Sequence, residues 1–494
     1  MPPPPRASCT AVCLALVLAA RARRAQAQAP PTVRTPCGTY EGVWRNDTTP
    51  PSAHFLGVRF AAAPARWRHS AAPDCDPAAY FVAARQAPAC VQDSMEREPL
   101  QQEDCLFLNV AVAPAAALPA PGAPPPAQGA LAPVLVFWHG GDLTFGTPAW
   151  YDEAVAAAAF ASDAAAGTGG PAVVVSPAYR LNVLGYLATA DLAAEQGGSA
   201  GNYGLGDQLA ALRWVQSNAA FFGGDAARVT VSGQSSGGTS VYGLLSGAGA
   251  RGLFSAAISI SGSENSSFVP ARKFAQDAAF AAAAGCGGGA SPAARVACLR
   301  DLPAGALANE TPPPWDNSPV QELPAGGPGG FGLPAIIYGD GLLAQLPLAP
   351  ALRAGLVDVP VLMMHTAQEL EMQPTWDVRA LTEAEWSASL AANLSAWGAP
   401  AIAEVLSAYA AESAVSPQLA LSSIAADLMT TCAMPGLAAD ALGAPGAART
   451  APIYALVGNA WPDNATGYPT FTPGYSTRYA MHMWDLVAAW RAWE

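Results

Sequence analysis

The amino-acid sequence predicts an α/β protein with a mostly parallel central sheet flanked by helices. Short apolar runs of strand length recur along the chain, for example at residues 134–138 and 172–175. Residues 206–220 then carry apolar side chains at helical spacing, and a further strand signal, with valines at 229 and 231, follows at residues 228–231. Continuous apolar runs are typical of parallel strands buried on both faces, and their alternation with helices is typical of this fold class.

The expected elements follow one another along most of the chain. Residues 55–60 are the clearest of several short strands in an N-terminal edge region, and residues 103–110 give a second strand signal. Residues 114–133 are rich in alanine and proline, which predicts an exposed extended loop inside one domain rather than a domain boundary. Further strands are expected at residues 134–138, 172–175, 228–231, 256–260 and 453–457.

Composition limits the possible functions. Of the 494 residues, 51% are hydrophobic and only 12% are charged, which excludes a disordered protein. The net charge of −13 disfavours nucleic acids and anionic membrane surfaces as partners. Beyond the first 29 residues we find no run of about 20 strongly apolar residues, so we expect a soluble mature protein.

The N-terminus resembles a secretory leader. Arg6 precedes an apolar run at residues 9–20, and small residues at 25–29 offer a cleavage site. Residues 1–29 are therefore predicted to be a signal peptide and residues 30–494 a single domain. Three arginines after the apolar run are atypical, which leaves an organelle-targeting segment or a retained anchor as alternatives.

The cysteines and glycosylation motifs favour the same secretory route. Seven of the nine cysteines lie beyond the leader, and none has the spacing of a zinc site. The chain also carries N-glycosylation motifs at Asn46, Asn265, Asn309, Asn393 and Asn464. An oxidising, extracellular environment fits these features best.

Ser235 is the candidate nucleophile. It stands in the pattern G-x-S-x-G, directly after the expected strand at residues 228–231 and before a helix. A sharp strand-to-helix turn of this kind needs small residues two positions before and after the serine, and Gly233 and Gly237 supply them. The free N–H groups at the start of the helix favour an oxyanion on the acyl partner of the serine.

Two similar patterns lack the required context. Residues 197–201 also fit G-x-S-x-G around Ser199, but no buried strand precedes them, so we interpret Ser199 as a loop residue. Residues 247–252 fit the dinucleotide pattern G-x-G-x-x-G, but a helical run precedes them where a strand is required. The sequence thus predicts neither a cofactor nor a metal ion.

A glycine loop is expected at the end of the strand at residues 134–138. The strand ends in Trp138 and is followed by His139, Gly140, Gly141 and Asp142. Glycines there permit close backbone approach, and their N–H groups could face an oxyanion. An ordinary glycine turn is the alternative interpretation.

Between residues 38 and 484 the chain resembles type B carboxylesterases, the cholinesterase-like branch of the α/β-hydrolase fold. The resemblance rests on several motifs in family order, which are residues 103–109, 138–141, 179–181, 201–208, 212–216, 222–225 and 233–238. It implies an α/β-hydrolase fold and the hydrolysis of carboxylic esters through an acyl-enzyme, with no cofactor.

The resemblance also implies the other catalytic residues. In this fold the order along the chain is serine, acid, histidine. Glu369 matches the family acid and His482 the family base, while Glu371 and Asp377 are further candidate acids. His365 is a rival base in the wrong chain order. The N–H groups of Gly141, Asp142 and Ser236 resemble the oxyanion hole of the family.

The sequence departs from the family at three positions, of which the last two named here bear on the rate. Leu370 replaces a usual glycine after the acid, and Asp142 stands where many members have a third glycine. Gln234 replaces the glutamate that usually precedes the serine, so slow or selective turnover is expected.

The substrate class follows from a cysteine-bounded loop. Residues 91–104 contain no aromatic residue, whereas cholinesterases hold the choline cation over a tryptophan in this loop. We therefore expect neutral carboxylic esters of small or medium acyl groups. The family includes adhesion proteins that have lost the nucleophile, so a binding protein with weak or no catalysis is the alternative function.

Finally, the resemblance implies cross-links and further chain. It pairs Cys90 with Cys105 and Cys286 with Cys298, whereas a bond between Cys37 and Cys75 is only a guess. Cys432 resembles a family cysteine whose partner lies in C-terminal helices beyond Glu494. We therefore expect a C-terminally truncated fold that aggregates or melts early. The oligomeric state cannot be predicted from these residues.

Overall fold

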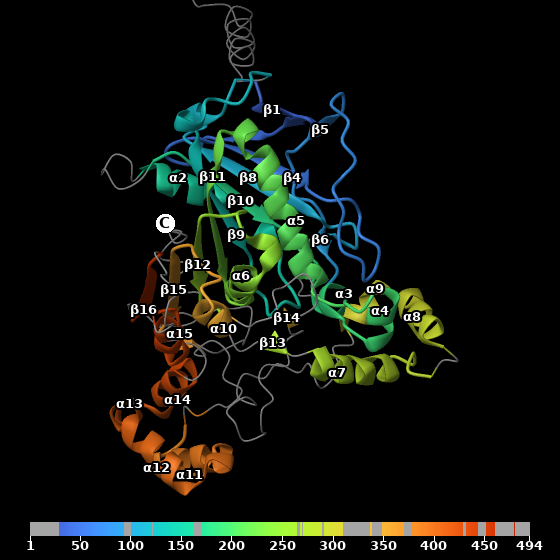
Figure 1. Cartoon of the computed structure of the whole chain (residues 1–494). Helices are drawn as coiled ribbons and strands as arrows, with labels where there is room; N and C mark the ends of the chain where they lie inside the picture. Colours follow the sequence, from blue (N-terminus) through green and yellow to red (C-terminus); the bar gives the residue numbers. More distant parts are fainter. Residues whose placement is uncertain are drawn as a thin grey trace, which may run out of the picture.

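The computed structural model in Figure 1 describes most of the chain. The described residues are 29–92, 100–120, 122–162, 170–263, 267–268, 270–288, 291–309, 336–337, 348–369, 378, 380–427, 431–442, 451–459 and 479. The predicted leader, except its last residue, lies outside them, as do His482, Glu371 and Asp377.

A nine-stranded mixed sheet forms the centre of the molecule. In spatial order its strands are β16 (Ile453–Gly458), β15 (Val361–Thr366), β12 (Ala256–Ile260), β11 (Gly224–Gln234), β9 (Ala132–Trp138), β10 (Ala172–Pro177), β8 (Phe107–Ala113), β4 (Ser52–Arg59) and β3 (Val43–Arg45). The six strands from β16 to β10 are parallel, and β8, β4 and β3 continue the sheet through antiparallel pairs. The predicted α/β class with a mostly parallel sheet is confirmed.

Helices cover both faces of the sheet, which explains why its central strands are apolar throughout. The described helices are α2 (Glu153–Ser162), α3 (Asn182–Tyr186), α4 (Ala190–Glu195), α5 (Tyr203–Asn218), α6 (Ser236–Ser246), α7 (Pro270–Ala283), α8 (Pro292–Asp301), α9 (Ala304–Asn309), α10 (Leu348–Arg353), α11 (Glu383–Asn393), α12 (Ala399–Ala408), α13 (Ala410–Val415), α14 (Pro417–Ala426) and α15 (Ala433–Leu442). Figure 1 shows α5 and α6 in front of the strands. Leu212 of α5 and Val241 of α6 share a buried cluster with Val136 and Val231 of the sheet.

The opposite face is covered by α2. Its alanines, such as Ala157, pack on Phe137 and Val174. The residues next to these two in the chain, Val136 and Val175, belong instead to the cluster that α5 and α6 cover. Successive side chains of a strand point to opposite faces, so an uninterrupted apolar run fits two covered faces.

Smaller units surround this core. Strands β1 (Thr32–Thr35), β2 (Gly38–Glu41) and β5 (Tyr80–Val82) form a three-stranded sheet. Two further pairs are β6 (Ala89–Cys90) with β7 (Gln101–Gln102) and β13 (Ser267–Phe268) with β14 (Ile336–Ile337). Helices α11 and α14 pack together through a cluster that includes Trp386, Leu390 and Ile424, α12 packs against this cluster, and Figure 1 places α11 to α14 below the sheet.

Some element boundaries differ from the prediction. The strand expected at residues 103–110 begins at Phe107, because Glu103 and Asp104 instead bind Arg66 and Arg59 through paired hydrogen bonds. The helix expected at residues 206–220 begins at Tyr203. The loop expected at residues 114–133 ends where β9 begins, at Ala132.

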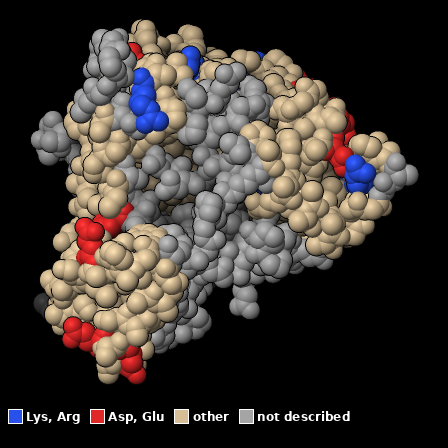
Figure 2. All heavy atoms as spheres, turned by 60° about the horizontal axis from the view of Figure 1, so that its bottom comes forward, with Lys and Arg blue, Asp and Glu red and all other residues tan. Residues whose placement is uncertain are grey.

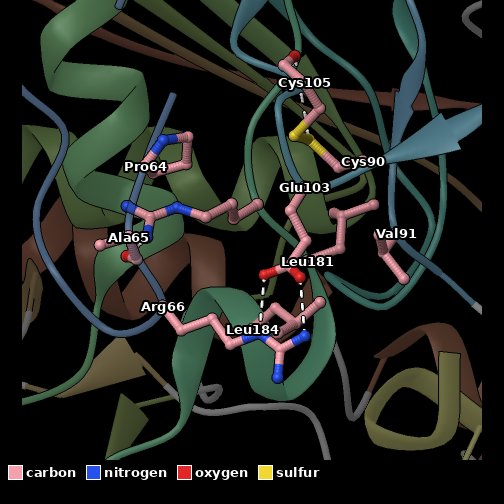
Figure 3. Close-up of a pocket in the computed structure, with 10 residues that line it drawn as sticks. Pro64, Ala65, Arg66, Cys90, Val91, Glu103, Cys105, Leu181 and Leu184 are labelled. Atoms are coloured by element: carbon pink, nitrogen blue, oxygen red, sulfur yellow. Dashed lines mark hydrogen bonds and ion pairs between the residues drawn. A yellow bond between two sulfur atoms is a disulfide. The ribbon is translucent and has the colours of Figure 1, made fainter. Parts of the chain in front are cut away.

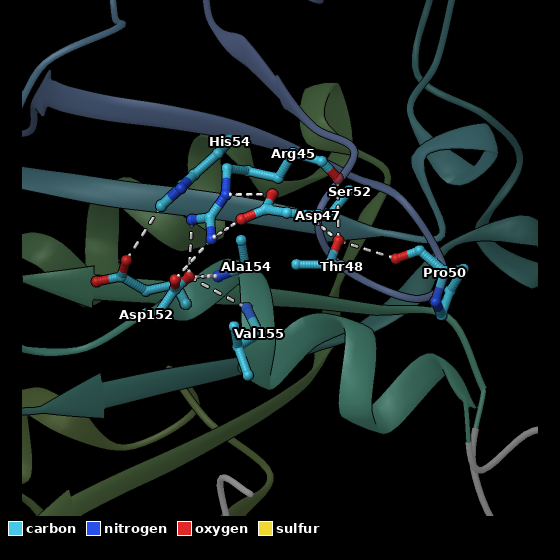
Figure 4. Close-up of polar contacts among 10 residues, drawn as sticks. Arg45, Asp47, Thr48, Pro50, Ser52, His54, Asp152, Ala154 and Val155 are labelled. Atoms are coloured by element: carbon cyan, nitrogen blue, oxygen red, sulfur yellow. Dashed lines mark hydrogen bonds and ion pairs between the residues drawn. The ribbon is translucent and has the colours of Figure 1, made fainter. Parts of the chain in front are cut away.

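Polar contacts fasten the start of α2 to the edge of the sheet (Figure 4). The Arg45 guanidinium donates to the carboxylates of Asp47 and Asp152. Asp152 in turn accepts the N–H of Ala154 at 3.1 Å, as a helix-capping residue does. Beneath these contacts the His54 ring lies 3.1 Å from the buried Glu153 carboxylate. The network therefore joins β3, β4 and α2.

An ion pair is fully buried on α7. Lys273 Nζ lies 2.6 Å from Asp277 Oδ1, and both side chains are shielded from solvent. Asp277 also accepts the N–H of Ala188 at 2.6 Å. Burial lowers the pKa of Lys273 and raises that of Asp277. The two charges therefore compensate each other in a place where either alone would be costly.

Candidate active site

Ser235 occupies the turn between β11 and α6. Its φ of 58° and ψ of −128° lie in a region that residues other than glycine rarely adopt. Its N–H donates to the carbonyl oxygen of Ile260 at 2.8 Å, and its carbonyl accepts the N–H of Thr239 at 3.0 Å. The surrounding structure thus holds the strained residue from both sides, and its side chain is only half-buried.

Gly233 and Gly237 make this turn possible. A Cβ atom on Gly233 would lie 2.3 Å from the carbonyl oxygen of Gly237. One on Gly237 would lie 2.2 Å from the carbonyl oxygen of Trp138, at the end of β9. Since real Cβ atoms do not approach this closely, only glycine fits at either position.

The loop after β9 packs directly against the candidate nucleophile. A Cβ atom on Gly140 would lie 2.9 Å from the Cβ atom of Ser235. The N–H of Leu143 donates to Oγ of Ser236 at 3.0 Å, which ties the loop to the first residue of α6. Gly141 and Asp142 both have positive φ angles. The segment around residues 140–143 is therefore a tight turn beside Ser235.

His139 supports this loop as a neutral side chain. Its ring stacks on Tyr179 with a centroid distance of 4.4 Å, and the Tyr179 hydroxyl donates to the His139 carbonyl at 2.7 Å. Burial lowers the pKa of His139 to about 4, although its hydrogen bond with the Gly140 carbonyl opposes the shift. At neutral pH the imidazole is therefore uncharged.

Glu369 lies just beyond the end of β15 and is only 3% exposed. Its Oε1 atom accepts hydrogen bonds of 2.6 Å from the Ser261 hydroxyl and from the N–H of Thr366. Strand β12 lies between β11 and β15 in the sheet. Because these three strands are parallel, Ser235, Ser261 and Glu369 follow their carboxyl ends at one edge of the sheet.

The rival base His365 has a different environment. It lies within β15, is 1% exposed, and its Nδ1 atom is 2.8 Å from the carbonyl oxygen of Thr366. The structure thus brings Ser235, Ser236, the loop at Gly141 and Asp142, and Glu369 to the same sheet edge. His482, the expected base, lies outside the described residues.

Comparison with known proteins identifies the family. The model of the Carboxylesterase family matches residues 29–462, which is most of the chain. The protein belongs to the carboxylesterase family.

Several curated relatives share part of this carboxylesterase-family chain. Human Neuroligin-2 is 34% identical over 323 residues, which are 57% of this chain and 36% of that protein. Carboxylesterase 4A of Bos taurus is 36% identical over 47% of this chain and 40% of its own length. Human Cocaine esterase is 39% identical over 42% of this chain and 35% of its own length. The chain thus matches well under half of the length of each of these relatives.

Solved structures agree on the fold. Two structures of PNB esterase superpose with a TM-score of 0.67 at 23% identity. They cover 93% of this chain, which covers 84% and 85% of theirs. The expected α/β-hydrolase fold is confirmed.

The described residues of this carboxylesterase-family chain contain three disulfides. Cys90 is bonded to Cys105 and Cys286 to Cys298, the two pairs that the resemblance implies. Cys37 is bonded to Cys75, the pair that the sequence left as a guess. Among the described residues Cys432 is the free cysteine, and it is exposed.

A small pocket lies beside the Cys90 to Cys105 disulfide (Figure 3). Val91, Leu181 and Leu184 contribute apolar side chains to its wall. The charged groups of the wall are already paired, since Arg66 binds Glu103 and Arg180 binds the buried Asp207. The pocket therefore offers no free charge to a ligand.

Two kinds of feature are absent from the described residues. None of their His, Cys, Asp and Glu side chains gather in a group of three or more that could hold a metal ion. None of their helices combines the length and apolarity needed to cross a membrane. Sequence reasoning did not find Ser261, because a serine after a strand carries no motif of its own.

Proposed function

We propose that the protein is a serine esterase that hydrolyses carboxylic esters through an acyl-enzyme. Ser235 is the nucleophile, His482 the general base and Glu369 the acid that orients it. The observation that carries the proposal is the strained backbone of Ser235, which the glycine turn and the neighbouring loop hold beside candidate oxyanion donors. Strain of this kind is typical of functional sites.

Each residue has a defined step in the reaction. His482 takes the proton of the Ser235 hydroxyl as Oγ attacks the ester carbonyl. The N–H groups of Gly141, Asp142 and Ser236 stabilise the oxyanion of the tetrahedral intermediate, and loss of one such donor typically costs about 3 to 4 kcal/mol. His482 then protonates the leaving alcohol. Water, activated by the same imidazole, hydrolyses the acyl-enzyme and frees Ser235.

Glu369 is suited to its role by its hydrogen bonds. The donors from Ser261 and Thr366 both reach Oε1 and fix the orientation of the carboxylate. Hydrogen bonds to a carboxylate favour its charged form. A charged Glu369 stabilises the imidazolium that forms during the attack by Ser235.

Neutral esters of small or medium acyl groups are the proposed substrates. Residues 91–104 lack an aromatic side chain that could bind a choline cation. The described surface in Figure 2 is mostly uncharged, with a few acidic side chains visible at its lower left and right and a few basic ones at its upper left and right. Neither feature favours a polyanionic or cationic substrate.

The secretory pathway is the proposed location. The three disulfides among the described residues support an oxidising compartment, and the N-terminal residues resemble a signal peptide. Asn46, in one of the glycosylation motifs, is exposed in the turn after β3. The N-terminal sequence of the mature protein should begin near residue 30, and a retained leader would contradict a cleaved signal peptide.

Labelling with a fluorophosphonate probe tests the esterase. The wild type should be labelled, and Ser235→Ala should not. Ser199→Ala is the matched control, because Ser199 occupies the second G-x-S-x-G pattern, in an ordinary loop, and should leave labelling intact. An unlabelled, correctly folded wild type would favour the alternative, a binding protein of the same family. The similarity to Neuroligin-2 keeps that alternative open.

A further inference from the structure

Gln92 joins two loops. One is the disulfide loop, which the bond between Cys90 and Cys105 closes, and the other is the loop at residues 139–146, which carries the candidate oxyanion donors. Its side chain is 2% exposed. Nε2 donates to the carbonyl oxygen of Gly146 at 3.0 Å, and Oε1 accepts the N–H of the same residue at 2.7 Å. Nε2 also donates to the Cys90 carbonyl at 2.9 Å. One amide thus satisfies both backbone groups of Gly146 and links them to a disulfide-bonded residue.

Gly146 closes the loop that begins at His139. Its φ is 119°, and a Cβ atom on it would lie 2.3 Å from His139 Nδ1 and 2.5 Å from the Gly140 carbonyl oxygen. Inside the loop the N–H groups of Thr144 and Phe145 both donate to the Gly141 carbonyl at 2.9 Å. A shift of Gly146 is therefore transmitted directly to Gly140 and Gly141.

A second side chain joins the same two segments. The N–H of Asn182 donates to the Leu143 carbonyl at 2.7 Å, while its Nδ2 donates to the Val91 carbonyl at 2.8 Å. Val91 precedes Gln92 in the chain, and it lines the pocket of Figure 3 together with Leu181, the neighbour of Asn182. The loop is thus attached to the disulfide loop at its middle and at its end.

We propose that Gln92 is a positioning residue for ester hydrolysis. Through Gly146 it sets the direction of the N–H groups of Gly141 and Asp142 without contacting the substrate. The inference rests on the proposed esterase function. Oxyanion donors act only when they are already aimed at the developing charge, and a misplacement of about 1 Å can cost about 100-fold in rate.

Gln92→Met tests this role. Methionine keeps the length of the buried side chain but loses all three hydrogen bonds. Hydrolysis of p-nitrophenyl acetate is measured with the full chain, and active sites are counted by fluorophosphonate labelling taken to completion. We expect kcat per labelled site to fall roughly 10- to 100-fold, with KM changed less than about threefold. This split is expected because the donors act on the transition state.

Gln216→Met is the matched control. Gln216 Nε2 also donates to two backbone carbonyls, of Ala226 at 2.8 Å and Leu253 at 2.9 Å, and neither of these partners belongs to the loop at residues 139–146. This variant should lose stability and keep the wild-type kcat per labelled site. If Gln92→Met behaves in the same way, Gln92 has only a structural role and the proposal is wrong.

Gln92→Glu is a second test of the proposal, which can be used if Gln92→Met does not fold. Glutamate keeps an acceptor for the Gly146 N–H but loses both donors, so kcat per labelled site should still fall. A wild-type kcat in this folded variant would also overturn the proposal. A folded wild type that neither labels nor hydrolyses the ester would instead refute the esterase function itself, so the two failures are distinguishable.

Discussion

The hydroxyl of Ser261 donates a hydrogen bond of 2.6 Å to Oε1 of Glu369. This bond crosses from the end of β12 to the end of β15 and replaces solvent around a buried carboxylate. A hydrogen bond to a charged group contributes about 1.5 to 3 kcal/mol. We therefore expect Ser261 to orient the proposed catalytic acid and its loss to have a measurable effect on the reaction rate.

Ser261→Ala should lower kcat/KM about 10-fold or more, because Glu369 loses one of the two donors to Oε1. Ser255→Ala is the control, since Ser255 precedes the start of β12 and donates to the Val229 carbonyl at 3.1 Å. It should hydrolyse esters at the wild-type rate. Equal kinetics in the two variants would refute the proposed role of Ser261 in orienting Glu369.

Gly237→Ala should destabilise the fold by several kcal/mol, because its Cβ atom would meet the Trp138 carbonyl oxygen at 2.2 Å. Gly243→Ala on the same helix is the control. There the nearest atom, Ile336 Cδ1, is 3.4 Å away, and alanine favours a helix by about 1 kcal/mol. Urea unfolding of both variants measures the difference. A Gly237→Ala protein as stable as the wild type would contradict the close packing of α6 against the end of β9 at this glycine.

Acid should weaken the fold through His139. Its folded pKa of about 4 lies below the ordinary value of about 6.5, so below pH 6.5 the unfolded chain binds a proton that the folded protein does not. The stability contributed by the neutral ring is complete above pH 6.5 and is lost as pH falls toward 4. The full effect is about 3 kcal/mol.

His139→Phe isolates this effect, because phenylalanine keeps a ring against Tyr179 but cannot titrate. Melting temperatures measured between pH 4 and 7.5 should fall less steeply for this variant than for the wild type. Parallel curves would mean that His139 does not titrate with a lowered pKa.

Removing only one partner of the buried ion pair between Lys273 and Asp277 should destabilise the fold more than replacing both partners. Lys273→Met leaves the Asp277 carboxylate buried without its cation, which typically costs about 3 to 5 kcal/mol. Adding Asp277→Leu should recover much of this loss, because two apolar side chains often replace a buried ion pair well. Denaturant unfolding of the single and double variants tests the coupling. A single variant as stable as the wild type would show that the pair is not a unit.

Local patterns in the sequence predicted the elements better than the contacts between them. Residues 256–260 were expected as a strand and form β12, and the turn at Ser235 follows from its glycines. The bonds from Ser261 to Glu369 and from Gln92 to Gly146 join residues far apart in the chain. No periodicity or spacing records which distant segments the sheet brings together.

The same limit applies to buried charge. Lys273 and Asp277 stand four positions apart on α7, a spacing that in most helices marks a solvated surface pair. Only the packing of α7 against Ala188 and its neighbours makes the pair a buried one. His482 could be proposed as the base only by resemblance, because an isolated histidine has no distinctive local pattern in the sequence.

The position of β16 at one end of the described sheet should slow folding. β16 pairs with β15 in parallel, with Ile453 opposite Val361, so a long stretch of chain must be looped out before this pair can form. Closing this loop costs conformational entropy before the two strands make any stabilising contact, and pairings of this kind slow folding. On the ribosome, β4, β8, β9, β10 and β11 can assemble while β16 is still unsynthesised. Until it emerges, the backbone of β15 has an open edge, so chaperones would meet a sheet that still lacks β16.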